Sequence, residues 1–331
     1  MKFATRGALV RIPIYCAIAI IAVAFFLSHI FRMPGRSHRG PLPELTPAQE
    51  ALSKELRCDD EVLAVQIGER NVGVLSNLYA AADFIENSLR DAGLPVARQE
   101  YRIGPTPVYN IEATLTGTER PDEIVIVGAH YDTVYQCPGA NDNGTGVAAL
   151  LALARRLAKT PLPRTVRFVA FVNEEPPFFR TSDMGSLVYA RRCRERNEDI
   201  VLMLSLETIG FYTDERHTQT YPVPAAFMYP DTGNFIGFAS NIKSVKMLRK
   251  VAGLFRTHAK FPSESGAVDI GWSDQWSFWK MGYPGVMVTD TAPYRYPWYH
   301  DPDDLPDKLD FDRMARVVEG LEWVVRGVAA Q

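Results

Sequence analysis

The sequence predicts an α/β protein whose mostly parallel, mixed central sheet is flanked by helices on both faces. Four apolar runs (IVIVGA, VRFVAFV, VLMLSL and GVMV) lack the polar alternation of half-exposed strands, which is typical of strands covered on both sides. Helical stretches alternate with these runs, as they do in other α/β folds. The composition, 47% hydrophobic and 23% charged, is that of a folded globular protein.

The N-terminus contains 20 successive residues, 12–31, without a charge, a length sufficient for a helix to cross a bilayer. We expect residues 1–31 to be an uncleaved membrane anchor; a cleaved signal and a buried core helix are the alternatives. Basic residues flank both ends of the run, and the charge of the amino terminus favours a cytoplasmic N-terminus. Everything after about residue 40 is then expected on the periplasmic or extracellular side.

Residues 32–45 are rich in proline, glycine and arginine, which is typical of a linker. A helix is expected to begin after Thr46, with Pro47 at its first position and Gln49 in a capping box. The other elements expected in one large domain, 46–331, are helices at 77–92 and 147–158 and strands at 111–116, 123–129, 165–172, 201–206 and 285–288.

Charge and cysteine content exclude two classes of function. Residues 1–40 hold six of the 36 lysines and arginines and no acid, so the remainder carries 30 basic against 39 acidic residues. A nucleic-acid-binding domain has the opposite balance. The four cysteines show no CxxC spacing, which argues against a thiolate zinc site and against thioredoxin-type chemistry. The sequence does not determine whether two of Cys58, Cys137 and Cys193 form a disulfide, and it does not determine the oligomeric state.

Polar side chains that can bind metals follow three of the apolar runs and precede one predicted helix. Each taken alone has an ordinary structural explanation, such as a buried histidine, a helix N-cap or a solvated acidic pair. Together they are expected at the carboxyl ends of neighbouring strands, where α/β sheets bind ligands. The set comprises His130, Asp132, Asp142, Glu174, Glu175, Glu207 and His300.

Two imidazoles with three or four carboxylates suit a pair of zinc ions. In such sites a carboxylate bridges the two ions, and a further carboxylate takes the proton of the bound water. Glu174 and Glu175 are adjacent on an extended backbone and therefore point in different directions. One of them can bind metal while the other stays free as a base.

The segments GAHYD, PGANDNGTG, NEE, SLETIG and YHDPDDLPDKLD, in this order, resemble the co-catalytic zinc aminopeptidase family. That family also contains glutamate carboxypeptidase II-like exopeptidases and the glutaminyl cyclases. The resemblance spans about residues 60–325 and implies a three-layer zinc-peptidase fold. It also implies a zinc-dependent exopeptidase, most simply an aminopeptidase, which hydrolyses peptide bonds with a metal-bound water.

The resemblance implies a role for each position of the set. Asp142 bridges the two zinc ions, and Glu174 is the general base. Asp132 is expected to orient an imidazole from behind the metal. The remaining metal ligands are His130, Glu175, Glu207 and His300.

Two departures from the family and two alternative functions remain. The ligand at Glu207 is more usually aspartate, and Gln275 stands where the family often has histidine after Ser-Asp. A glutaminyl cyclase, which is a single-zinc acyltransferase, is the first alternative, although the sequence NDNGTG fits the peptidases better. A non-catalytic receptor on the same fold is the second.

Residues outside these motifs are assigned less sharply. His217 and His258 match no motif and are expected at the surface. A group of aromatic residues near the motifs is expected to be either core or a pocket for an apolar side chain. Its members are Phe178, Phe179, Tyr294, Tyr296, Trp298 and Tyr299.

Overall fold

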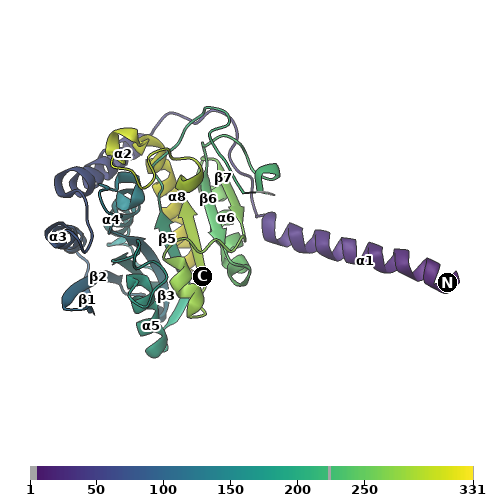
Figure 1. Cartoon of the computed structure of the whole chain (residues 1–331), viewed down its shortest axis with the longest axis horizontal. Coiled ribbons are helices and arrows are strands. Elements are labelled where there is room, and N and C mark those ends of the chain that lie inside the picture. The colour runs from purple at the N-terminus through teal and green to yellow at the C-terminus, as the bar shows by residue number, and fades with distance from the viewer. Residues whose placement is uncertain (1–5, 223–224, 331) are drawn as a thin grey trace.

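The computed structural model describes residues 6–222 and 225–330 of the chain. Its centre is one eight-stranded sheet in the order β1-β2-β4-β3-β5-β8-β6-β7, with helices packed on it (Figure 1). The strands are β1 (Val96–Ile103), β2 (Thr106–Leu115), β3 (Arg120–His130), β4 (Arg164–Phe171), β5 (Asp199–Glu207), β6 (Ile236–Ser240), β7 (Ser263–Gly266) and β8 (Gly285–Thr289).

The strands at the middle of the sheet are parallel. β4, β3, β5 and β8 all run in one direction, so their carboxyl ends meet at one edge. On one side of this centre, β2 runs antiparallel to β4, and β1 runs antiparallel to β2. On the other side, β6 runs antiparallel to β8, and β7 runs parallel to β6. The mostly parallel, mixed sheet predicted from the apolar runs is therefore confirmed.

Helices cover both faces of the sheet and complete three layers. One face packs against α3, α4, α6 and α8, with α2 lying on α4 and α8, and the other face packs against α5 and α7. The helices are α1 (Arg6–Phe31), α2 (Pro47–Glu61), α3 (Leu75–Asp91), α4 (Thr145–Leu157), α5 (Gly185–Glu195), α6 (Val245–His258), α7 (Gln275–Lys280) and α8 (Phe311–Ala330).

The two hydrophobic cores explain why the strand sequences do not alternate. On β3, Val125 and Val127 belong to the larger core, under α4 and α8. Ile124 and Ile126 point to the opposite face and belong to the smaller core, under α5. Because successive strand residues face opposite sides, a strand that is buried on both faces reads as a continuous apolar run.

The N-terminal segment contains an apolar helix outside the body of the molecule. Within α1, the stretch Ile14–Phe31 has a mean hydropathy of 2.4, and only 6% of it is buried. The helix extends away from the rest of the chain (Figure 1). Its length and composition suffice to cross a membrane. At its end, Arg249 donates a 3.3 Å hydrogen bond to the backbone oxygen of His29, which joins this end to α6.

The predicted start of α2 is confirmed in detail. The Thr46 side chain accepts a hydrogen bond from the Gln49 backbone, and the Gln49 side chain accepts one from the Thr46 backbone, with Pro47 in the first turn. Residues 32–46 form no helix or strand. All four cysteines have free thiols, so none of the disulfides left open by the sequence is present.

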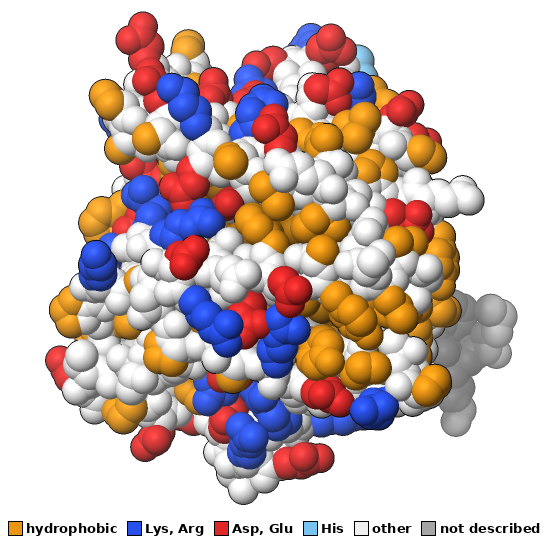
Figure 2. All heavy atoms as spheres, turned by 90° about the vertical axis from the view of Figure 1, so that its left-hand side faces the viewer, with side chains coloured by type: hydrophobic (Ala, Val, Ile, Leu, Met, Phe, Trp, Pro, Cys, Tyr) orange, Lys and Arg blue, Asp and Glu red, His pale blue; other side chains and the backbone are white. Residues whose placement is uncertain are grey.

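The surface does not show a large patch of one charge on the side of α3 and β1. Figure 2 shows that face, where lysine and arginine side chains are interspersed with aspartate and glutamate. Several of these neighbours form ion pairs, such as that between Arg98 and Asp83.

Candidate metal centre

The fold brings the predicted site residues to the carboxyl edge of three adjacent strands. His130 is the last residue of β3 and Glu207 the last residue of β5, while Glu174 and Glu175 follow the end of β4. Asp142 lies in the turn that leads into α4. His300 comes from the loop before α8. The set therefore converges although its members are up to 170 residues apart in the sequence.

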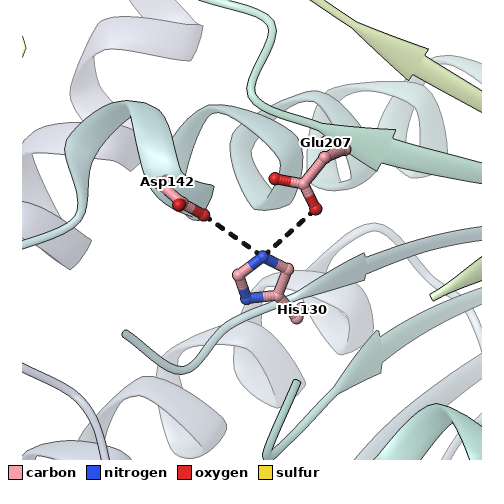
Figure 3. Close-up of side chains that lie close together, drawn as sticks. All are labelled: His130, Asp142 and Glu207. Atoms are coloured by element: carbon pink, nitrogen blue, oxygen red, sulfur yellow. Dashed lines mark ion pairs between the residues drawn. The ribbon is translucent and has the colours of Figure 1, made fainter. Parts of the chain in front are cut away.

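The carboxylate of Asp142 lies between the two histidines. Its Oδ1 is 3.3 Å from Nε2 of His130, and its Oδ2 is 3.1 Å from Nε2 of His300. Nε2 of His130 is also 3.3 Å from Oε2 of Glu207 (Figure 3). Nε2 of His300 is 3.4 Å from Oε1 of Glu175. Each oxygen of Asp142 thus faces a different histidine, and each of these histidines contacts a different glutamate.

These contacts define two groups of metal-competent atoms that share one residue. In one group, His130, Asp142 and Glu207 place a ligand atom each within 4.8 Å of one another. In the other group, Asp142, Glu175 and His300 meet the same limit. A third group joins His130 with Glu174 and Glu175, so Glu174 lies beside the shared centre.

Burial makes the ionisation of this centre unusual. Glu174 and Glu175 are each 5% exposed, and burial raises the pKa of both carboxyls, that of Glu175 to about 7. Burial also raises the pKa of Glu207. Burial alone would lower the pKa of His130, but the neighbouring carboxylates of Glu207 and Glu174 raise it well above its ordinary value. The centre thus holds four carboxyl groups beside two imidazoles, and burial disfavours the charged form of Glu174, Glu175 and Glu207.

The donor set fits a metal cation. Oδ1 of Asp142 and Oε1 of Glu175 are buried and have no hydrogen-bond partner within the described chain. No lysine or arginine among the described residues forms an ion pair with the carboxylates of the centre. Within the described chain these two oxygens face only the imidazoles of His130 and His300, at 3.3 and 3.4 Å, and burying carboxylates with so little compensation is costly. Imidazole nitrogens and carboxylate oxygens at strand ends are ligands that zinc accepts.

Asp132 connects the histidine strand to the glutamate pair. Its carboxylate accepts hydrogen bonds from the backbone N–H groups of Glu174 and Glu175, each at 3.1 Å. Nδ1 of His130 lies 3.2 Å from the backbone oxygen of Asp132 and 3.6 Å from its Oδ1. Asp132 thus contacts both the imidazole and the segment that carries the two glutamates.

Arg70 is a buried residue of the site region that the sequence did not single out. Its guanidinium donates hydrogen bonds only to backbone oxygens, at distances from 2.5 to 3.1 Å. One acceptor is Tyr131, next to His130, and two others are Pro138 and Gly139, just before Asp142. Arg70 therefore ties the end of β3 to the loop that carries Asp142.

Asp304 supports the same loop from the other side. Its carboxylate oxygens accept hydrogen bonds from the backbone N–H groups of Asn141 and Asp142, at 2.8 and 3.1 Å, and one from the Tyr296 hydroxyl at 2.7 Å. Burial raises the pKa of Asp304 to about 6. The acidic run after His300 was noticed in the sequence, but this contact with the Asp142 loop was not foreseen.

The segment that departs from the family is buried beside the centre. Asp274 and Gln275 are fully buried, and burial raises the pKa of Asp274 to about 7. The Gln275 amide donates to the backbone oxygen of Ile270 at 3.1 Å. Elsewhere, His217 is exposed and pairs with Asp231 at 2.7 Å.

The aromatic residues near the motifs divide between core and pocket. Tyr294 and Tyr299 line a cavity of about 290 Å³ that begins at Glu207. Tyr296 and Trp298 instead pack on the ring of Phe211, with ring centroids 5.0 and 6.2 Å away. Phe178 and Phe179 are half-buried and do not line the cavity. Tyr296 therefore belongs to the core, whereas Tyr294 and Tyr299 line the cavity.

Comparison with known proteins relates this chain to metallopeptidases. The sequence profile of Peptidase family M28 matches residues 110–324. The uncharacterized protein YfbL of Escherichia coli (strain K12) is 34% identical over 318 residues, which cover 91% of this chain and 97% of that protein. Aminopeptidase YwaD of Bacillus subtilis (strain 168) is 29% identical over 276 residues, which cover 75% of this chain and 54% of that protein.

Solved structures share the fold at low sequence identity. BSAP, a zinc aminopeptidase from Bacillus subtilis, has a TM-score of 0.68 and 16% identity, and the match covers 84% of this chain and 95% of BSAP. The glutaminyl cyclase of Fimbriiglobus ruber has a TM-score of 0.62 and 20% identity, and the match covers 87% and 99% of the two chains. The fold is thus common to peptidases and cyclases.

Proposed function

Because the chain belongs to peptidase family M28, we propose that the centre around Asp142 holds two zinc ions and removes residues from the amino ends of peptides. Membership of the family makes the chain a hydrolase and a zinc-dependent metallo-exopeptidase. The number of ions, the role of each residue and the location in the cell are the proposed parts.

The observation that carries the proposal is the sharing of Asp142 between two groups of ligand atoms. Its two oxygens face opposite directions, toward His130 and toward His300, at 3.3 and 3.1 Å. A carboxylate in this position is suited to bridge two cations. Each group then adds one glutamate of its own, Glu207 on the side of His130 and Glu175 on the side of His300.

The remaining acidic residues support the two ligand groups. Glu174 lies beside the centre but outside both groups, so its carboxylate is free to exchange a proton. Asp132 is a positioning residue, because it contacts the ring of His130 and holds the backbone of Glu174 and Glu175. Such contacts behind a metal ligand fix its orientation.

When bound, two zinc ions would polarise the carbonyl of the scissile peptide bond and acidify a water molecule. Glu174 then accepts the proton of the attacking water and delivers it to the departing amine. Burial raises the pKa of Glu174, which in this role helps the carboxyl to hold the proton between the two transfers. The apolar cavity next to Glu207 is the space available to the side chain of the N-terminal residue.

Glutaminyl cyclase is the alternative that the sequence left open. The likeness to the cyclase of Fimbriiglobus ruber is a likeness of fold, whereas the named sequence relative YwaD is an aminopeptidase. The second group of ligands, around His300, also supports a two-ion site over a single-zinc acyltransferase. Every position of the set carries a side chain that can bind a metal ion or exchange a proton. This argues against a non-catalytic receptor.

The N-terminal helix supports a location at a membrane. We propose that residues 1–31 anchor the chain, that 32–45 form a linker and that 46–331 are the catalytic domain on the periplasmic or extracellular side. The apolar stretch Ile14–Phe31 is 6% buried. A core helix would be mostly covered by the protein, so this exposure favours a lipid environment.

The proposed reaction is tested with the full-length protein purified in detergent. We expect release of nitroaniline from aminoacyl-nitroanilides, loss of this activity with a zinc chelator, and its return when zinc is added back. Glutamine-initiated peptides distinguish the alternative, because a cyclase converts them to a pyroglutamyl product without releasing an amino acid. Cyclisation without hydrolysis would contradict the aminopeptidase assignment.

A further inference from the structure

The cavity beside the metal centre has a polar feature that a simple apolar pocket would lack. It is lined mostly by apolar and aromatic residues, among them Phe235, Trp272 and Met287. Two carboxylates, those of Glu207 and Glu264, also line it, and none of its described lining residues is a lysine, arginine or histidine. Glu207 belongs to the metal centre, which leaves Glu264 without an assigned role.

Strand pairing places Glu264 on the same face and in the same row as the metal centre. Gly128 pairs with Ser205, so His130 and Glu207, each two residues further on, share one face of the sheet. Glu207 pairs with Thr289, Thr289 pairs with Gly237, and Gly237 pairs with Glu264. The row runs across β3, β5, β8, β6 and β7 and forms the floor of the cavity.

The row also sets the distance from the scissile bond to Glu264. Neighbouring strands are about 4.8 Å apart, so three steps separate the backbones of Glu207 and Glu264 by roughly 14 Å. Between them lie Thr289 and Gly237, and the glycine adds no side chain to this row. A lysine side chain extends about 6 Å from Cα to its ammonium, by ordinary bond lengths. The side chains of Glu207 and Glu264 themselves cover part of this gap. A long substrate side chain therefore reaches Glu264, and a short one does not.

The carboxylate of Glu264 has no partner of its own. Among residues 6–222 and 225–330 it makes no hydrogen bond and no ion pair. The nearest cations act on it only from a distance. Burial raises the pKa of Glu264, and the charges of Arg256 and Arg39 oppose that rise. Arg256 is engaged by Ser263, whose backbone oxygen accepts a 3.0 Å hydrogen bond from its guanidinium.

We propose that Glu264 selects substrates whose N-terminal residue is lysine or arginine. These side chains combine an apolar stem with a terminal cation. The stem would lie along the aromatic and aliphatic walls, and the cation would meet Glu264 at the far end. This inference rests on the proposed aminopeptidase function and names its substrate class.

Norleucine provides the matched test, because it has the length of lysine but no ammonium group. We expect full-length wild-type protein to have a kcat/KM at least tenfold higher for lysyl- than for norleucyl-nitroanilide. The substitution Glu264→Gln should lower the lysyl-to-norleucyl ratio by about 10- to 100-fold, since the ammonium then meets a neutral amide in place of a carboxylate. Glu195→Gln, which changes an exposed residue of α5, should leave the ratio unchanged.

A binding measurement separates this inference from the proposed function. By calorimetry, L-lysinamide should bind the wild type more tightly than L-norleucinamide, and Glu264→Gln should remove the difference. A preference for norleucyl compounds in the wild type would overturn the inference. An equal loss for both compounds in Glu264→Gln would also overturn it, because Glu264 would then be recognising the α-amine. Absence of all turnover would contradict the proposed function, and the amide titrations would still decide the role of Glu264.

Discussion

The substitution Arg70→Met tests whether the loop that carries Asp142 depends on one buried guanidinium. Arg70 is fully buried and donates five hydrogen bonds to backbone oxygens. Methionine fills much of the same space but has no donor. All five oxygens lose this donor, and within the described chain only those of Leu63 and Gly139 keep a backbone N–H partner. The fully buried Asp60, on which the charge of Arg70 acts, loses a stabilising cation.

The expected change in the free energy of unfolding follows from two opposing contributions. Each hydrogen bond from a charged donor contributes about 1.5–3 kcal/mol, but burying a guanidinium costs several kcal/mol. Removing one partner of a buried charged network typically costs about 3–5 kcal/mol. We therefore expect Arg70→Met to lower the free energy of unfolding by about that amount. Because the Asp142 loop loses its attachment to β3, zinc affinity should fall about 10- to 100-fold.

Two measurements separate the effect on the site from the effect on the fold. Chemical denaturation gives the free energy of unfolding, and competition with a chelator of known affinity gives the zinc dissociation constant. Arg167→Met is the control, because Arg167 pairs with Glu198 at 2.7 Å, away from the Asp142 loop. The control should lose stability but keep its zinc affinity. An Arg70→Met protein with unchanged zinc affinity would refute the reasoning.

Two further substitutions test the roles within the centre. Glu174→Gln should keep its zinc while kcat falls about 10²- to 10⁴-fold, because Glu174 is proposed as the general base and not as a ligand; preserved turnover would remove Glu174 from that role. His300→Ala should lose one zinc ion per chain in elemental analysis, whereas His258→Ala, which removes a ring stacked on Trp323 far from the motifs, should lose none. A His300→Ala protein with a full complement of zinc would exclude His300 as a ligand.

The parallel centre of the fold could be predicted because its strands are buried on both faces. Continuous apolar sequences mark β3, β4, β5 and β8, and their shortness and content of valine and isoleucine favour buried strands over buried helices. Of the peripheral strands, β2 was predicted in part, at 111–116, whereas β1, β6 and β7 were missed. β7 reads Ser-Glu-Ser-Gly, a composition typical of a turn, and it is a strand only because it pairs with β6. The local sequence does not indicate that β7 pairs with β6.

Most of the proposed ligands could be predicted because they follow a recognisable strand end or precede a helix, whereas His300, in the loop before α8, was assigned through the family resemblance. The residues that support them could not. Arg70 lies 61 positions before Tyr131, and its polar surroundings in the sequence resemble a surface segment. Glu264 is recognised only from the register of four strands, two of which, β6 and β7, were not predicted. Long-range contacts of this kind require the folded structure.

The zinc content of the full-length protein tests the central claim most directly. Elemental analysis of the wild type purified in detergent should give two zinc ions per chain. Asp142→Ala should lose both, because the two groups of ligands share this carboxylate. One zinc ion in the wild type, or two ions retained in Asp142→Ala, would contradict the proposed two-ion centre.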